Sequence, residues 1–542
     1  MPMITYFTNT VILIAPIVLW LSGLIPAKFA NKNAKLMSRI NSAAAWTAFT
    51  SALLAAIAYL FDSAHSVTLF SLPLPGDIGA FTISTYINSV TLIMLALVSF
   101  VGAIVSRYAR NYLDGDPQQG RFHKWLLLTL ASILTLIISG NLLMFSIAWI
   151  STSLCLHQLL MFYKSRPAAV LAAHKKFIAS RIGDVSLIVA ILLIGSSLHT
   201  LEFEEVFHLM STLDGPLPMS LHWASWLIIL SAGLKSAQFP FHGWLIQVME
   251  APTPVSALLH AGIVNAGAFL VIRMSPIVSH SQSALAMLAI VGLITLALAS
   301  LVMLTQTSIK VSLAWSTTAQ MGFMLLECGL GLYSLAMLHL VAHSLYKAHA
   351  FLASGSGVDG FRAPTIGYAT DQPRVWQKFI AFIFAALVTL GIGMAFGISI
   401  SDQPALLAVG FVIAIAMTQL LLQATSLDSN RTFMLRALGL SVLVCTAYFT
   451  LHHGFELALA GSVLPVRTTT GAFELTLVLI IMATFAALLL LQQAFKSGHS
   501  RLREVIYVHL YNGLYIDVYI TRMLQRIWPA PITYAKDDGG KA

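Results

Sequence analysis

The chain has few charged residues: Asp, Glu, Lys and Arg make up 9% of its 542 residues, against about 25% in an ordinary soluble domain. Its three cysteines, Cys155, Cys328 and Cys445, lie far apart inside apolar segments. They form neither a CxxC pair nor a disulfide framework, so we expect each to pack in the protein interior. No glycine-rich phosphate loop, haem motif or iron–sulfur spacing occurs. We therefore expect no cofactor and no metal on this chain.

Hydrophobic residues fill the sequence instead, at 58% of the chain and a mean hydropathy of +0.83. Apolar segments of about 20 residues, the length of a membrane-crossing helix, recur about fifteen times. The sequence therefore predicts an all-α polytopic membrane protein embedded in a lipid bilayer. The segments lie near residues 8–26, 41–61, 88–106, 123–139, 141–163, 177–197, 221–238, 254–272, 283–304, 311–328, 333–353, 379–398, 405–424, 437–453 and 472–494.

The net charge of +9 is distributed by loop and does not indicate a nucleic-acid partner. Loops rich in Lys and Arg remain in the cytoplasm, so we expect the N-terminus outside and, with an odd number of spans, the C-terminus inside. The basic residues after the first, third and fifth segments are Lys28, Lys32, Lys35, Arg39, Arg107, Arg110, Arg121, Lys124, Lys164, Arg166, Lys175 and Lys176. The acidic residues after the second and sixth segments are Asp62, Asp77, Glu202, Glu204, Glu205 and Asp214.

One lysine, Lys235, lies deep inside an apolar segment and is followed by Pro240. A lysine at the bilayer centre costs about 2.5–3.5 kcal/mol on insertion scales, so we expect it to have a function. A proline breaks a helix, and a broken helix in a bilayer must be buried in protein or line a water-filled cavity. We interpret Lys235 as a proton-relay or ion-gate group beside a break at Pro240. The alternative is a lysine whose ammonium reaches back to the membrane surface.

Two other segments carry ionisable residues at bilayer depth. Arg181 and Asp184 share one helix face and can pair, either as a structural ion pair or for charge transfer. His260 follows two prolines that set the start of a helix. It is either a hydrogen-bonded interior residue or a relay partner of Lys235.

A later segment carries His339, His343 and Lys347, which recur every four residues and therefore share one helix face. Histidine changes charge near neutral pH and a buried lysine can release its proton, so this stripe can pass a proton. Ordinary packing, or a zinc site built on the HxxxH spacing, are the alternatives. Gly355 beyond the stripe predicts a second helix break. The candidate path, extended by two residues that flank segment 311–328, is Arg181, Asp184, Lys235, His260, Lys310, Glu327, His339, His343 and Lys347.

Two segments outside the predicted spans are amphipathic. The apolar positions within residues 201–210 predict a short helix on the outer surface. The tail from Arg501 to Trp528 combines Tyr, Arg and apolar residues. It predicts either an interfacial helix or a docking surface for another subunit.

Several of these stretches resemble the antiporter-like membrane subunits, a family that includes NuoL of respiratory complex I and the large subunits of Mrp-type cation/proton antiporters. The resemblance runs from about residue 85 to about residue 360, with a weaker echo at 511–517. The matching stretches are Arg181-Ile-Gly-Asp184-Val, Gly233-Leu-Lys-Ser-Ala-Gln238, Ala251-Pro-Thr-Pro-Val-Ser-Ala-Leu-Leu-His260-Ala, Thr307-Ser-Ile-Lys310-Val-Ser-Leu-Ala-Trp-Ser-Thr, Gln320-Met-Gly-Phe, and residues 339–355.

This resemblance implies two inverted repeats with broken helices around a central polar axis. It implies that Lys235 exchanges protons and that the residues matching His260, His339, His343 and Lys347 carry the relay onward. We expect N-terminal transmembrane helices at 1–106, a first repeat at 107–274, a second repeat at 275–430, and C-terminal helices with a cytoplasmic tail at 431–542.

The sequence also departs from the family pattern. The family has Trp-Glu on its fifth span, where this chain has Trp149 and Ile150. Ser401 stands where the family has lysine, and Glu327 stands where the family is usually apolar. These departures count against an ordinary complex I or Mrp subunit. The chain is more similar to a divergent branch, the DabB-type membrane subunits of bacterial inorganic-carbon pumps.

The DabB-type resemblance implies a transport subunit of the bacterial inner membrane, not an enzyme. It implies that H⁺ or Na⁺ flows down its gradient and drives a cytoplasmic, carbonic-anhydrase-like zinc partner of the DabA type, which accumulates bicarbonate. One alternative is a proton-pumping subunit of a redox complex, which would co-purify with quinone or iron–sulfur subunits. The other is an Mrp-type cation/proton antiporter subunit, whose loss would lower salt tolerance without rescue by high CO₂.

Overall fold

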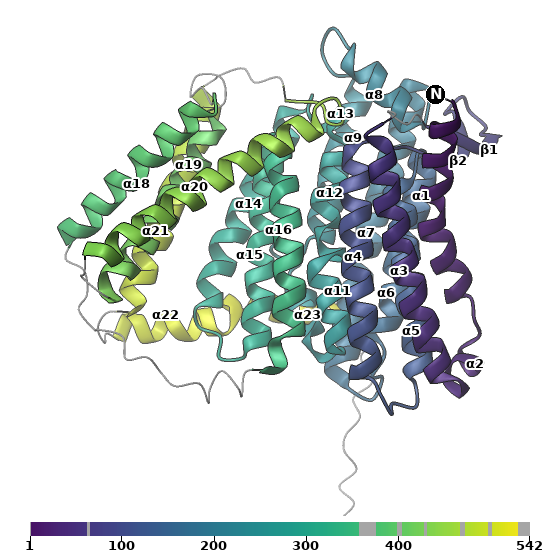
Figure 1. Ribbon diagram of the computed structural model, residues 1–542, viewed down its shortest axis with the longest axis horizontal. Helices are drawn as coiled ribbons and strands as arrows, with labels where there is room; N and C mark the ends of the chain where they lie inside the picture. The colour runs from purple at the N-terminus through teal and green to yellow at the C-terminus, as the bar shows by residue number, and fades with distance from the viewer. Residues whose placement is uncertain are drawn as a thin grey trace, which may run out of the picture.

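The computed structural model describes residues 2–61, 66–356, 375–397, 404–427, 431–466, 472–496 and 501–528. Long helices lie side by side through most of the molecule (Figure 1). Eleven helices in these ranges are long and apolar enough to cross a membrane. The predicted all-α polytopic class is therefore confirmed, whereas the number of about 15 spans and the four-part division of the chain stay predictions.

The N-terminal half forms an upright bundle with a large apolar core. Asparagine caps begin two of its helices: the Asn88 side chain accepts from the Thr91 amide at 3.0 Å, and Asn141 accepts from the Leu143 amide at 3.0 Å. The helices are α1 (Pro2–Gly23), α2 (Ala27–Lys32), α3 (Ala34–Tyr59), α4 (Ser89–Tyr112), α5 (Gln119–Ile138), α6 (Leu142–Leu160), α7 (Pro167–Leu198), α8 (Phe203–Ser211) and α9 (Met219–Lys235).

The middle of the chain contains interrupted helices. The predicted span 254–272 is not one helix: α11 ends at Ala261, and a 3₁₀ turn separates it from α12. The elements from α10 to the next long helices are α10 (Gly243–Gln247), η1 (Val248–Glu250), α11 (Thr253–Ala261), η2 (Ile263–Asn265), α12 (Ala266–Arg273), α13 (Ser275–Val278), α14 (Gln282–Met303), α15 (Ile309–Gly329), α16 (Tyr333–Leu352) and η3 (Ser354–Ser356).

The C-terminal helices lean away from the upright bundle, and two short ones cross its lower end (Figure 1). This lower segment is the predicted amphipathic tail, which forms two helices around a 3₁₀ turn. The elements are α18 (Val375–Ala395), α19 (Ala405–Leu427), α20 (Arg431–Leu459), α21 (Ala472–Lys496), α22 (Arg501–Tyr511), η4 (Gly513–Tyr515) and α23 (Ile516–Ile527).

The upper end contains α8 and a β-hairpin, and the hairpin was not predicted from the sequence. The predicted short helix is confirmed as α8, and it buries Phe203, Val206 and Met210. Strands β1 (Val67–Pro73) and β2 (Ala80–Thr85) pair antiparallel. The turn between them contains Gly76 and Gly79 with positive φ, a conformation that glycine adopts without steric cost. Gly76 and Gly79 are the residues from which the turn of the hairpin could have been predicted.

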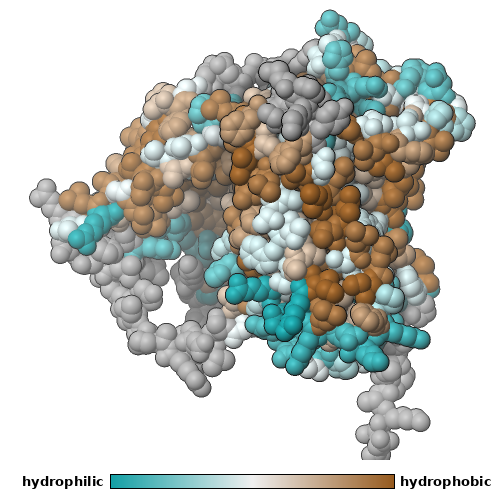
Figure 2. All heavy atoms as spheres, turned by 45° about the vertical axis from the view of Figure 1, so that its right-hand side comes forward, coloured by the Kyte–Doolittle hydropathy of each residue, from teal (hydrophilic) through white to brown (hydrophobic). Residues whose placement is uncertain are grey.

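Hydropathy separates the two ends of the bundle. In Figure 2 a largely hydrophobic band lies between hydrophilic residues at the top and at the bottom. The lower end contains α2 with Lys28 and Lys32, and the upper end contains α8 with Glu204 and Glu205. The arrangement matches a protein that crosses a bilayer many times.

Candidate functional site

Lys235 is the last residue of α9, and Pro240 lies in the irregular segment before α10 begins at Gly243. Ala237 in this segment has a φ of 51°, in the left-handed region that non-glycine residues rarely adopt. Lys235 is 5% exposed and its Nζ has no hydrogen-bond partner. Nζ lies 4.2 Å from the centre of the Trp149 ring. A desolvated cation–π contact contributes about 2 kcal/mol, which offsets only part of the cost of burying a charge.

The Arg181–Asp184 pair predicted from the sequence is present on α7, with Nη2 and Oδ2 2.5 Å apart. Gly183 beside it packs against Ser231 and Leu234 of α9. This packing brings the pair close enough for both charges to act on Lys235. Asp184 is therefore an intramembrane carboxylate near the lysine, although no carboxylate occupies the position of Ile150.

Lys235, Trp149, Arg181, Asp184 and Lys176 form what we call the first cluster. Lys176 was not predicted from the sequence as one of its members. We predicted that Lys175 and Lys176 lie in a basic loop, which is wrong: both are buried in α7, which begins at Pro167. Lys176 Nζ donates to the Ser153 carbonyl at 2.9 Å and to Ser153 Oγ at 2.7 Å, and its charge acts on Lys235. Pro167 could have indicated that a helix begins there and includes Lys175 and Lys176, because proline favours the first helical turn.

A second cluster joins α15 and α16. His339 Nδ1 lies 2.9 Å from Glu327 Oε2, and His339 Nε2 lies 2.7 Å from Gln320 Oε1. Glu327 is 2% exposed. The buried glutamate that departs from the family pattern therefore has a histidine as its direct partner.

The other predicted residues of this cluster lie further along α16 and on α11. The His343 ring centre is 6.3 Å from that of His339, and neither His343 nitrogen has a hydrogen-bond partner. His260 stacks on Phe351 with ring centres 4.4 Å apart. Lys347 donates to the Leu313 carbonyl at 3.1 Å. Electrostatic interactions link His343 to His339, His260 and Lys347.

A small cavity of about 20 Å³ adjoins Lys235 and also borders Thr152 and Gly262. This volume is enough for one water molecule. Gly262 ends α11 two residues after His260, so the cavity lies between the first cluster and the interrupted helix that carries part of the second. At Gly267 a side chain would clash with the Ser236 hydroxyl and the Ala232 carbonyl, so glycine permits the close approach of α12 to α9.

Lys310 and Gly355, two residues predicted from the sequence, lie at the edge of the two clusters. Lys310 donates to Thr253 Oγ1 at 3.0 Å, and no contact joins it to the described ionisable residues of either cluster. α16 ends at Leu352, beyond the stripe, and Gly355 lies in the 3₁₀ turn that follows; its role as a second helix break stays a prediction. Ser401 lies outside the described residues. Within the described ranges, no group of three His, Cys, Asp or Glu residues could hold a metal ion.

Two protein-family descriptions match the sequence. "NADH:quinone oxidoreductase/Mrp antiporter, TM" matches residues 139–366, and "NADH-Ubiquinone oxidoreductase (complex I), chain 5 N-terminus" matches residues 76–123. All nine candidate path residues lie within the first range.

The chain is also 44% identical over 530 residues to "Probable inorganic carbon transporter subunit DabB2" of Halothiobacillus neapolitanus, which covers 97% of this chain and 96% of that protein. The chain belongs to the DabB family. It is 39% identical over 445 residues to "Probable inorganic carbon transporter subunit DabB" of Hydrogenovibrio crunogenus, covering 82% of this chain and 83% of that relative.

A solved structure shows the same fold. A chain of the "Structure of Mrp complex from Dietzia sp. DQ12-45-1b" superposes with a TM-score of 0.64 at 21% identity. The match covers 96% of this chain and 59% of that chain. The DabB-family protein is thus a multi-pass membrane transport subunit with an antiporter-like fold, as the sequence predicts.

Proposed function

We propose that this DabB-family chain is the membrane subunit of an energy-coupled inorganic-carbon pump. H⁺ or Na⁺ flows down its gradient through the two clusters, and this flow drives a cytoplasmic, carbonic-anhydrase-like zinc partner of the DabA type that accumulates bicarbonate. The hydration chemistry belongs to the partner. The observation that carries the ion path is the series of buried ionisable side chains, of which Lys235 and His260 lie beside helix interruptions.

The burial of these groups supports transport over a purely structural role. Lys235, Lys176 and Lys347 are 5%, 2% and 1% exposed, and no carboxylate among the described residues lies within ion-pair distance of any of them. Ionisable groups inside a membrane are costly, and they usually mark ion pathways or proton relays. A structural role would favour directly paired charges, because an unpaired buried charge is destabilising.

We propose an inner-membrane location with the N-terminus outside and the C-terminus in the cytoplasm. The support is the segregation of charge: α2, which carries Lys28 and Lys32, lies at the lower end of the bundle, opposite the acidic α8 (Figure 1). Lys- and Arg-rich loops stay on the cytoplasmic side. The tail helices α22 and α23 lie at this basic end (Figure 1).

The tail supplies a direct connection between the first cluster and the proposed cytoplasmic side. Asp517 of α23 pairs with Lys175, Oδ2 to Nζ at 2.7 Å, and accepts from Gln247 Nε2 of α10 at 3.0 Å. A side chain at Gly243 would collide with the Asp517 carboxylate. One tail residue therefore contacts both the neighbour of Lys176 and the segment that follows the break after Lys235. We define the contacts of Asp517 with Lys175, Gln247 and Gly243 as the tail clasp.

An ion moving through the first cluster can act on the partner through the tail clasp. One charge crossing the membrane releases about 2.3 kcal/mol per 100 mV, which changes a two-state equilibrium about 50-fold. This is enough to bias a partner between two conformations.

The test is uptake of labelled inorganic carbon in cells that produce both proteins. We expect uptake to stop when protonophore and sodium ionophore collapse both gradients, and to be absent when either protein is omitted. Uptake that survives loss of both gradients contradicts the ion coupling. Full uptake by this chain alone contradicts the need for a partner.

A further inference from the structure

A cavity of about 500 Å³ opens at the end of the bundle that carries α8, away from the tail clasp. The helices α14, α16 and α19 begin beside it, and α15 and α20 end there. Its rim is tied to α13: Ser279 Oγ donates to the Leu464 carbonyl at 2.9 Å, and the Leu464 amide donates to Ser275 Oγ at 3.1 Å. By the orientation proposed above, this cavity faces the outside.

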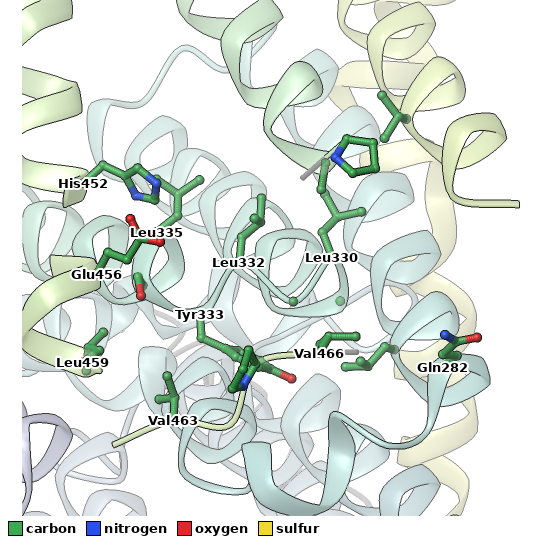
Figure 3. A pocket seen from close by; sticks show the side chains of 18 of the residues that line it. Gln282, Leu330, Leu332, Tyr333, Leu335, His452, Glu456, Leu459, Val463 and Val466 are labelled. Carbon is green, nitrogen blue, oxygen red and sulfur yellow. The ribbon is translucent and has the colours of Figure 1, made fainter. Parts of the chain in front are cut away.

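The ionisable side chains of the cavity suit a cation. Glu456 and His452 of α20 lie close together on one wall (Figure 3). Glu456 has His453 as its neighbour, at 3.8 Å. No Lys or Arg occurs among the described residues that line the cavity. A carboxylate at the mouth of a cavity without fixed positive charge concentrates cations.

His452 borders two cavities. It lines the outer cavity and also a second cavity of about 240 Å³ whose wall includes Tyr448. His452 is 7% exposed, and its Nδ1 has no hydrogen-bond partner. Its ring stacks on that of Tyr448, with centres 6.5 Å apart and an interplanar angle of 16°.

Tyr448 in turn lies near the second cluster. Tyr448 packs against the buried Leu335 and Leu338 of α16, next to His339, and its hydroxyl interacts electrostatically with the Glu327 carboxylate. Gly329 and Leu330, which follow Glu327 on α15, also line the outer cavity. Glu456, His452, Tyr448 and the Glu327–His339 pair therefore form a series of neighbouring side chains that begins at the outer cavity.

We propose that this cavity is the outer entrance of the ion path, and that it delivers a monovalent cation, H⁺ or Na⁺, through His452 and Tyr448 to Glu327. The proposal rests on the proposed function for the direction of flow. It makes Glu456 the carboxylate at the mouth of the path and Glu327 the buried carboxylate that receives the cation.

Thiol labelling tests the entrance independently of uptake. The three native cysteines are buried, so a cysteine at Glu456→Cys is the accessible one. Intact cells receive a membrane-impermeant cationic methanethiosulfonate, and a maleimide then detects the thiols that remain free. Glu456→Cys itself should lower carbon uptake, because the carboxylate is lost; we expect the cysteine to react from outside, and the attached positive charge to abolish the remaining uptake.

Leu457→Cys is the matched control, because Leu457 is 65% exposed and does not line the cavity. Modification there should leave uptake unchanged. The proposal is overturned if Glu456→Cys reacts only from the cytoplasmic side, or if it reacts from outside while uptake continues. Insensitivity of unmodified protein to both gradients contradicts the proposed function instead, without affecting the labelling result.

A second variant tests the inner step. His452→Asn should lower gradient-driven uptake while the outside labelling of Glu456→Cys persists, because the mouth stays open and the connection to Tyr448 is lost. The control is His199→Asn on the same end of the bundle, where the histidine side chain is 61% exposed and asparagine tolerates the positive φ. Equal uptake by the two variants contradicts the role of His452.

Discussion

The two polar clusters differ in how their charges are compensated. Around Lys235 the ammonium has an aromatic face and nearby charges but no hydrogen-bond partner. Around His339 both ring nitrogens have partners, Glu327 and Gln320, within 2.9 Å. The Lys235 ammonium is therefore held without a bonded partner, whereas His339 belongs to a bonded acid–base pair.

This difference indicates different tasks. A group that must gain and lose a proton works best when neither charge state is fixed by strong partners. A carboxylate bonded to a histidine can instead hold a cation or proton that arrives from a cavity. We assign proton exchange to the first cluster and capture of the incoming ion to the second, and the following variants test that contrast.

The largest effect is expected at Lys235. Lys235→Ala removes the exchanging group, and Lys235→Arg retains the charge but cannot release its proton at usable pH. Both variants should lower carbon uptake by about 100-fold or more, as loss of an essential proton-transfer group does. Membrane content of the protein should be unchanged, since a missing charge eases insertion.

The control for this charge change is Lys28→Arg in the exposed part of α2, which should transport normally. Normal uptake by Lys235→Arg would show that Lys235 is only a fixed positive charge. The contrast between the clusters would then be lost.

A smaller loss is expected in the second cluster. Glu327→Gln should reduce uptake by about tenfold, because it removes the intramembrane anion but leaves the hydrogen-bonding shape. The same change at Glu204, an exposed residue of α8, should have little effect. Adding His339→Gln to Glu327→Gln should cause little further loss, because the two residues act as one unit. Additive losses of uptake in the double variant would show that Glu327 and His339 act independently.

The tail clasp provides a third test, which concerns the coupling of ion flow to the partner. Asp517→Asn leaves Lys175 buried without its anion, and breaking a buried pair costs about 3–5 kcal/mol. We expect the tail to detach, so protease added to inside-out vesicles should cleave α23 faster and uptake should fall several-fold. Glu504→Gln on exposed α22 is the control for tail charge.

A compensating variant distinguishes coupling from simple destabilisation. Asp517→Asn combined with Lys175→Met removes both charges and should restore protease resistance. If uptake also returns to the unsubstituted level, the ion pair serves stability alone. We expect uptake to remain low, because the charge connection to the first cluster is still missing.

The smallest effect is expected at Trp149. Trp149→Leu removes the aromatic face from Lys235 but keeps an apolar side chain. The loss of a cation–π contact of about 1–2 kcal/mol should lower uptake by a few-fold. Trp223→Leu on the same helix as Lys235, where the tryptophan is 58% exposed, should behave as the unsubstituted protein. Equal uptake by Trp149→Leu and Trp223→Leu would show that Trp149 does not contribute to the site.

Much of the site could be predicted because helical spacing is a local property. The four-residue period placed His339, His343 and Lys347 on one face, and the three-residue spacing brought Arg181 and Asp184 into contact. The position of Pro240 after Lys235 indicated where α9 ends. These predictions needed only the geometry of a single helix.

Other features could not be predicted because they depend on contacts between distant segments. The interruption at Gly262 follows from packing of α11 and α12 against neighbouring helices, and nothing in the apolar run around it indicates a break. Lys175 looked like a loop lysine because its partner, Asp517, lies 342 residues away. His452 stood in a predicted span with no sequence relation to Glu327.

The sequence by itself determined that this is a polytopic helical membrane protein, because hydropathy and segment length decide membrane insertion one segment at a time. It also indicated many of the buried ionisable residues, but not Lys175 and Lys176. Only the tertiary structure decided which of them are neighbours. A buried charge is compensated by whatever groups packing brings near it, so partners such as Trp149 for Lys235, Ser153 for Lys176 and Asp517 for Lys175 appear only once the helices are assembled.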